Sequence, residues 1–173
     1  MRRRGRGRPK GTGGPVTILC SEDEKSLARF LRNDHDERGK LAILLSVALG
    51  LRASELTALR FVDVFSTEGR VLPALVLKTK LSAAPARRLP LKAKEIRTTL
   101  ADYFEQQAAF ASIDPAQPLF RSQRGGHLTT ASMARYLTSI YAKAGIKHAT
   151  SRSGRATRRA RLMALDDNFG FFA

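Results

Sequence analysis

Apolar residues between positions 21 and 165 recur mostly three or four places apart, which is the spacing of helices that bury one face. Two short stretches, residues 70–78 and 88–91, instead have the apolar pattern of strands, and the loop of residues 80–86 between them predicts a hairpin. We therefore expect a mostly helical α+β chain with one small antiparallel sheet. The helical spacing predicts helices over residues 21–31, 37–49, 53–59, 93–111, 129–144 and 151–165.

Helix boundaries follow from residues that favour helix ends. Ser21 with Glu24 three residues later has the spacing of a capping box, so the first helix is expected to begin there. Gly50 and Gly145 are expected to end the helices that precede them, because glycine readily adopts the left-handed conformation that terminates a helix. Ser151 is expected to cap the last helix.

The composition excludes several classes of protein. With 43% hydrophobic and 27% charged residues the chain is globular rather than disordered. The longest apolar run, residues 41–45, is too short to cross a bilayer, and no apolar segment follows the basic N-terminus of the chain, so we expect neither a membrane partner nor a secretory signal. The single cysteine, Cys20, excludes an internal disulfide and fits a reducing, cytoplasmic compartment. His35, His127 and His148 lie far apart in the sequence, so no metal site is predicted.

The positive charge is concentrated in two places. The net charge is +16, and residues 1–10 hold six basic residues while residues 143–161 hold seven, with no acidic residue in either stretch. Such density favours a polyanionic partner, and double-stranded DNA is the commonest one. The alternative is a solvated surface that keeps the protein soluble. The basic residues expected to contact DNA are Arg2, Arg3, Arg4, Arg6, Arg8, Lys10, Lys78, Arg158 and Arg159.

Residues 1–17 predict a flexible Arg/Gly-rich tail, because this composition cannot bury a core. Within it, residues 6–9 (RGRP) resemble the core of an AT-hook, an arm that lies in the narrow minor groove of A·T-rich DNA. A generic tail that binds phosphates without a groove preference is the other interpretation, and the sequence leaves both open.

Several basic residues stand at the ends of predicted elements. Arg52 lies at the beginning of a short helix, and Glu55 follows one turn later, where a bidentate pair with Arg52 would orient the guanidinium. Lys78 and Lys80 lie near the tip of the hairpin, and Arg155 lies in the first turn of the last helix. Guanidinium groups can clamp two oxygens of one phosphate, and a lysine can give a proton to a departing oxygen. Each residue alone is more typical of a surface salt bridge.

Taken in order, these residues resemble the characteristic motifs of the tyrosine recombinases, the phage integrase family. The resemblance runs from residue 18 to about 163, and the domain it suggests covers residues 18–165. Its blocks are residues 50–56 (GLRASEL), 59–64 (LRFVDV), 77–80 with 87–91 (LKTK and RRLPL), 118–126 (PLFRSQRGG) and 144–155 (AGIKHATSRSGR).

The resemblance implies a function and a set of roles. In this family two arginines and a histidine hold the scissile DNA phosphate, a lysine protonates the leaving 5′ oxygen, and a tyrosine forms a 3′-phosphotyrosine, without a metal or nucleotide cofactor. Carried over, Arg52 and Arg155 are the two arginines, Glu55 supports them, and Lys80, with Lys78 as the alternative, is the lysine. The partners implied are double-stranded DNA and other recombinase subunits.

The chain also departs from the family pattern. Arg152 stands where the family has a histidine, and arginine keeps a positive donor there but cannot relay a proton at neutral pH. No histidine or tyrosine follows Arg155, and residues 166–173 do not resemble the family's continuation. We therefore expect an incomplete, C-terminally truncated catalytic domain that lacks its nucleophile and is inactive alone. The Arg/Gly tail occupies the place of the N-terminal domain of larger integrases.

Tyr103, Tyr136 and Tyr141 precede the second arginine motif and have apolar neighbours on predicted helices, so core positions are expected for them rather than a nucleophilic role. The competing function is a non-catalytic basic protein that binds DNA or RNA in an architectural role. The position of Arg52 relative to Arg155 distinguishes the two functions, because only the recombinase interpretation requires both guanidinium groups to face one basic concavity.

Overall fold

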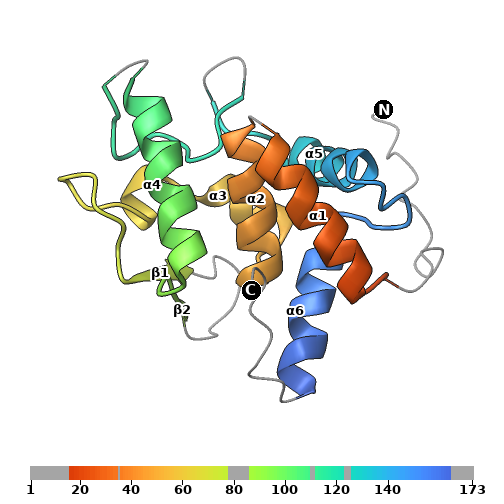
Figure 1. Cartoon of the computed structure of the whole chain (residues 1–173). Helices are drawn as coiled ribbons and strands as arrows, with labels where there is room; N and C mark the ends of the chain where they lie inside the picture. Colours follow the sequence, from red (N-terminus) through yellow and green to blue (C-terminus); the bar gives the residue numbers. More distant parts are fainter. Residues whose placement is uncertain (1–15, 35, 78–85, 110–111, 123–125, 165–173) are drawn as a thin grey trace, which may run out of the picture.

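The computed structural model describes residues 16–34, 36–77, 86–109, 112–122 and 126–164. Within these ranges the chain is mostly helical with one small antiparallel sheet, which confirms the predicted fold class (Figure 1). The elements are α1 (Ser21–Asn33), α2 (Glu37–Ala48), α3 (Ala53–Ala58), the 3₁₀ turn η1 (Phe61–Asp63), β1 (Ala74–Leu77), β2 (Arg87–Pro90), α4 (Lys94–Ala108), α5 (Thr130–Lys143) and α6 (Ser153–Met163).

Helix α2 is the centre of the fold. Eight of its twelve residues are buried, on all sides of the helix, because its sequence from Leu41 to Val47 is apolar apart from Ser46. It contacts α3, α4, α5 and α6, and Figure 1 shows it between α4 on one side and α6 on the other. Elements from both halves of the chain are therefore held against one buried helix.

The predicted hairpin is present, but its first strand is shorter than residues 70–78. β1 pairs with β2 in an antiparallel register that sets Leu75 opposite Leu89 and Val76 opposite Arg88. Leu75 is buried and Val76 is 46% exposed, so the two faces of the hairpin differ. The stretch before β1 bonds elsewhere, since the Leu72 N–H donates to the Val64 carbonyl oxygen. This competing partner shortens the strand.

Two of the predicted helix caps are wrong. Helix α1 is capped by Cys20, whose backbone N–H donates to the Asp23 carboxylate at 3.1 Å, so the capping residues lie one position before the predicted pair. Helix α6 begins at Ser153, and Arg152 rather than Ser151 precedes it. The Ser153 hydroxyl accepts a hydrogen bond from the Thr150 N–H at 2.9 Å and thereby fixes this turn.

Other predicted boundaries are confirmed. Thr129 caps α5 by accepting a hydrogen bond from the Ser132 N–H. Gly50 and Gly145 have φ angles of +69° and +85°, the left-handed conformation expected of residues that end helices. The turn at Gly50 matters for the site, because Arg52 and helix α3 follow it directly.

The side of the molecule near η1 is an aromatic core. Phe61 stacks on Phe65 and Tyr103, with ring centroids 5.7 and 6.3 Å away, and Tyr103 also contacts Phe120. The Tyr103 hydroxyl donates to the Leu119 carbonyl oxygen at 2.6 Å. This core fixes α4 relative to η1, and with it the strand β2 that leads into α4. Among the helices that the structure describes, none is long and apolar enough to span a bilayer.

Candidate functional site

Arg52 and Arg155 line one hollow of about 580 Å³. The two residues are 103 positions apart in the sequence, and α3 and α6 bring them together. We call this the arginine hollow. It is lined by Val16, Arg52, Ala53, Ser54, Thr130, Ala134, Ser151, Arg152, Arg155, Ala156 and Arg159.

Arg52 is held by the beginning of helix α3. Its backbone N–H donates to Glu55 Oε2 at 2.7 Å, while the preceding residue, Leu51, is fully buried. The buried leucine and this hydrogen bond fix the backbone at Arg52, and the side chain is left exposed at the wall of the hollow. Helix α3 packs against α5, whose first turn also lines the hollow.

Arg155 is held more tightly, in the first turn of helix α6. Gly154 before it lies so close to α2 that a Cβ there would stand 2.7 Å from Ser46 Oγ and 3.0 Å from Tyr141 Oη. This close approach brings the first turn of α6 against the centre of the fold. Arg155 is therefore carried on a helix end that has little room to shift.

The guanidinium of Arg155 has an unusual environment. Its Nη1 is buried and has no hydrogen-bond partner among the described residues. Burial, and then the positive charge of Arg52 nearby, lower the pKa of Arg155. A buried donor without an acceptor costs free energy.

Glu55 does not pair with the guanidinium of Arg52 as the sequence suggested. Its Oε2 accepts from the Arg52 backbone N–H and lies 3.4 Å from Nη2 of Arg87 on β2. The carboxylate therefore joins the beginning of α3 to the hairpin. The predicted side-chain pair is wrong because the backbone N–H at the helix start is the nearer donor.

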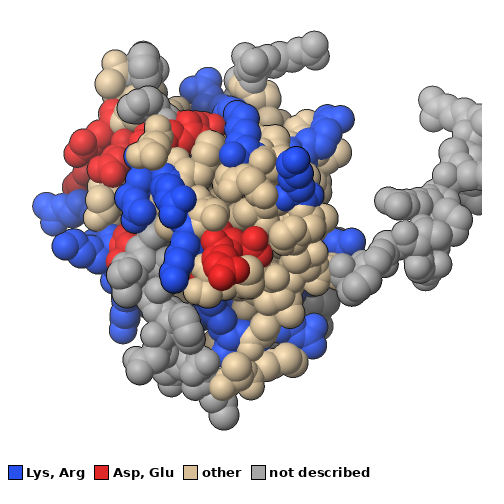
Figure 2. Space-filling model, turned by 45° about the vertical axis from the view of Figure 1, so that its right-hand side comes forward, with Lys and Arg blue, Asp and Glu red and all other residues tan. Residues whose placement is uncertain are grey.

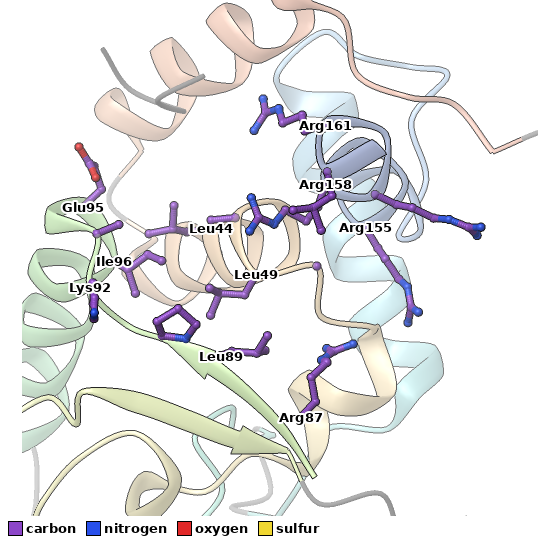
Figure 3. Close-up of a pocket in the computed structure, with 16 residues that line it drawn as sticks. Leu44, Leu49, Arg87, Leu89, Lys92, Glu95, Ile96, Arg155, Arg158 and Arg161 are labelled. Atoms are coloured by element: carbon purple, nitrogen blue, oxygen red, sulfur yellow. The ribbon is translucent and has the colours of Figure 1, made fainter. Parts of the chain in front are cut away.

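Arg87 is a basic residue beside the arginine hollow that the sequence did not single out; it lines a neighbouring cavity. Its Nε is buried without a hydrogen-bond partner in the described part of the chain, and its positive charge contributes to the lowered pKa of Arg155. Figure 3 shows Arg87 and Arg155 reaching toward the same region from β2 and α6. Arg87 is the first of two adjacent arginines in the hairpin's second strand, and only its ion pair with Glu55 in the folded chain shows which of the two reaches α3.

The other predicted basic residues are placed as follows. Arg152 and Arg159 line the arginine hollow, and both are exposed. Arg158 does not line it and instead faces a neighbouring cavity, which Arg155 and Arg159 also line. Lys78 and Lys80, and the basic residues among positions 1–10, lie outside the described residues. On the face shown in Figure 2, acidic side chains gather in groups with basic ones around them, so this face carries mixed charge.

All three tyrosines of the chain are in the described part, and the side chain of each is either buried or hydrogen-bonded to another residue. Tyr103 and Tyr141 are buried, and the half-buried Tyr136 donates its hydroxyl hydrogen to the Asp36 carboxylate. Burial raises the pKa of Tyr103 to about 12 and also raises those of Tyr136 and Tyr141. None of them lines the arginine hollow.

Comparison with known proteins shows the family of the chain. A sequence profile of the phage integrase family matches residues 18–165. The chain belongs to the phage integrase family. No curated protein matches the chain significantly.

The solved structures that share this fold have low sequence identity to the chain. The crystal structure of XerA recombinase is 22% identical, with a TM-score of 0.68, and the match covers 95% of this chain and 56% of that one. XerH site-specific recombinase bound to its difH substrate is 21% identical, with a TM-score of 0.66 and coverages of 88% and 44%. The Tn1549 transposon integrase in complex with transposon right-end DNA is 20% identical, with a TM-score of 0.63 and coverages of 92% and 57%. The chain thus spans about half the length of these structures, whose fold it shares.

Proposed function

We propose that this chain binds double-stranded DNA as part of a site-specific recombinase, with one backbone phosphate in the arginine hollow. The observation that carries the proposal is the buried Nη1 of Arg155, a charged donor without an acceptor among the described residues, on a side chain that lines a hollow shared with Arg52. A phosphate oxygen supplies the acceptor and the opposite charge at once. XerH and the Tn1549 integrase, which share the fold, were each solved with DNA.

In this proposal Arg52 and Arg155 clamp the phosphate from two sides of the hollow. Arg152 adds a third positive donor at the hollow's wall, and Arg87 with Glu55 holds the hairpin against the site. Lys80, or Lys78 in its place, is the proton donor to a leaving 5′ oxygen. The basic tail, residues 1–10, adds phosphate contacts that do not depend on sequence.

The chemistry proposed for the whole recombinase is strand cleavage and rejoining through a 3′-phosphotyrosine, without a metal or nucleotide cofactor. This chain supplies the phosphate clamp, and other recombinase subunits are its partners on DNA. Because its own tyrosines are buried or hydrogen-bonded away from the hollow, we propose that the chain alone binds DNA without cleaving it. The proposed location is the cytoplasm, on DNA.

A titration of labelled duplex DNA tests the phosphate clamp. We expect Arg155→Gln and Arg52→Gln each to weaken binding about tenfold or more, because a hydrogen bond to a charged group contributes about 1.5–3 kcal/mol. The logarithmic dependence of affinity on salt should also become less steep, by about 0.9 for each phosphate that the variant no longer neutralises. Arg70→Gln is the matched control, since Arg70 is exposed and lines neither the hollow nor the neighbouring cavity.

Two results would contradict the proposal. An equal reduction of affinity in Arg70→Gln would mean that only the net charge matters. Binding to duplex RNA as tight as to duplex DNA, and insensitive to Arg155→Gln, would favour the architectural binding protein instead.

A further inference from the structure

The cavity next to the arginine hollow has about the same size, about 560 Å³, and a different character. It lies between the end of α2, strand β2, the beginning of α4 and the length of α6, and Figure 3 shows its lining. We call it the hairpin cavity. Its apolar floor includes Leu44, Leu49, Leu89 and Ile96, and its basic rim consists of Arg87, Lys92, Arg155, Arg158, Arg159 and Arg161.

The apolar surface continues from the cavity to the end of helix α6. Leu162 lines the cavity and is 59% exposed, and Met163 beside it is 69% exposed. These are the two most exposed large apolar residues that the structure describes. An apolar floor that continues onto exposed apolar residues is typical of a surface that another segment covers.

The lining defines which segment fits. An apolar floor takes aromatic or aliphatic side chains, and a basic rim takes carboxylates. Residues 165–173 (LDDNFGFFA) begin directly after Ala164 and contain one leucine, three phenylalanines and two aspartates, with no basic residue. We propose that residues 165–173 bind in the hairpin cavity of the same chain, with the phenylalanines on the floor and Asp166 and Asp167 against the arginines of the rim.

Distance does not limit this contact. Nine extended residues reach about 30 Å, and the segment starts at the end of the helix that forms one wall of the cavity. Because the segment is tethered, its concentration at the cavity is high, and modest contacts are enough to keep it bound. Two of the rim's arginines already face carboxylates, since Arg87 pairs with Glu55 and Arg161 with Glu24. Asp166 and Asp167 are therefore proposed to lie against the other basic residues of the rim, where the lining holds one acidic residue, Glu95.

The contact has a consequence for the neighbouring site. Arg155 and Arg159 line both the hairpin cavity and the arginine hollow, so the bound segment places carboxylates beside the proposed phosphate position. If the proposed function holds, the segment and a DNA phosphate compete for these arginines. The binding of the segment to the cavity does not itself depend on DNA.

Disulfide trapping in the full chain tests the contact directly. In a Cys20→Ser background, Phe171→Cys is combined either with Leu89→Cys, at a residue that lines the cavity, or with Val76→Cys, the matched control. Val76 lies on the same hairpin but on its other face, since it pairs with Arg88 while Leu89 pairs with the buried Leu75. Lys92→Cys, at the exposed rim, is a second cavity position that does not disturb the core. The rate of disulfide formation is measured by mass spectrometry at low protein concentration.

We expect the Leu89 and Lys92 pairs to form intramolecular disulfides at least about tenfold faster than the Val76 pair, because binding raises the effective concentration of the thiols. Asp166→Asn with Asp167→Asn should slow the trapping. Equal rates for the cavity and control positions would overturn the proposal. Disulfides that form between chains, at a rate that rises with protein concentration, would also overturn it, since a second copy would then be the occupant. None of these outcomes involves DNA, so failure here leaves the phosphate clamp untouched.

Discussion

Gly154 shows how a single residue positions the site. A Cβ at this position would stand 2.7 Å from Ser46 Oγ and 3.0 Å from Val47 Cγ2, both on the buried helix α2. Gly154→Ala therefore forces α6 away from α2, and we expect the free energy of unfolding to fall by about 1–3 kcal/mol in urea denaturation. Ser46→Ala in the same chain should recover part of this stability, because it removes the nearest atom.

Gly126 provides the matched control for that substitution. A Cβ there meets nothing within 4 Å, so Gly126→Ala should leave the unfolding curve unchanged. If Gly154→Ala were as harmless as Gly126→Ala, the close approach of α6 and α2 would not be what holds Arg155 in place.

For single residues, the sequence predicted which side chains belong to the site but not which partners they have or how deeply they are buried. Arg52, Glu55 and Arg155 stand at the beginnings of predicted helices, and the sequence predicts them as site residues because their ordered motifs resemble those of the phage integrase family. The partner of Glu55 was not predictable, since Arg87 lies 32 positions away in the sequence and reaches Glu55 only in the folded chain. The burial of one Arg155 nitrogen likewise depends on tertiary packing, which no local pattern encodes.

Among the elements, helix α1 depends on one carboxylate at its beginning. Burial of the Asp23 carboxyl opposes its ionisation, but hydrogen bonds with Cys20 and contact with His148 lower its pKa overall. We expect Asp23→Ala to reduce the free energy of unfolding at pH 7 by about 0.5–2 kcal/mol, the usual cost of removing a helix cap. Glu22→Ala removes a carboxylate from the same turn and should cost less, because Glu22 is exposed.

The effect of Asp23 should depend on pH with a defined sign. A carboxyl whose pKa is lowered by folding stabilises the fold above its ordinary pKa of 3.8, and this contribution disappears as the pH falls through the lowered value. Thermal unfolding of Asp23→Ala and of the unsubstituted chain should therefore differ at pH 7 and converge in acid. A difference that grows on acidification would contradict this assignment.

The sequence predicted which helices and strands form better than it predicted the residues at which they begin and end. Helical spacing located the helices α1 to α6, because each of them buries at least one face. The capping residues of α1 and α6 were each misplaced, since Ser21 and Ser151 are good caps in isolation but Cys20 and Arg152 occupy those positions in the fold. The strand predicted over residues 70–78 was too long because Leu72 bonds to Val64 outside the hairpin.

For the whole molecule, the placement of the tyrosines predicts the outcome of a cleavage assay. We expect no covalent protein–DNA species when the chain alone is incubated with a nicked duplex and analysed on a denaturing gel. The reason is that all three hydroxyls are buried or donate to protein acceptors, and burial raises their pKa values. A denaturation-resistant adduct that disappears with Tyr136→Phe, the least buried tyrosine, would refute this expectation.

The central claim is that two arginines from distant parts of the chain hold one phosphate, and a double-mutant cycle on DNA affinity measures this directly. If Arg52 and Arg155 share a phosphate, the effects of Arg52→Gln and Arg155→Gln should be non-additive, with a coupling of about 0.5–3 kcal/mol. The same cycle between Arg70→Gln and Arg155→Gln should be additive within about 0.5 kcal/mol. Full additivity of Arg52→Gln and Arg155→Gln would contradict the claim, because the two side chains would then bind DNA independently.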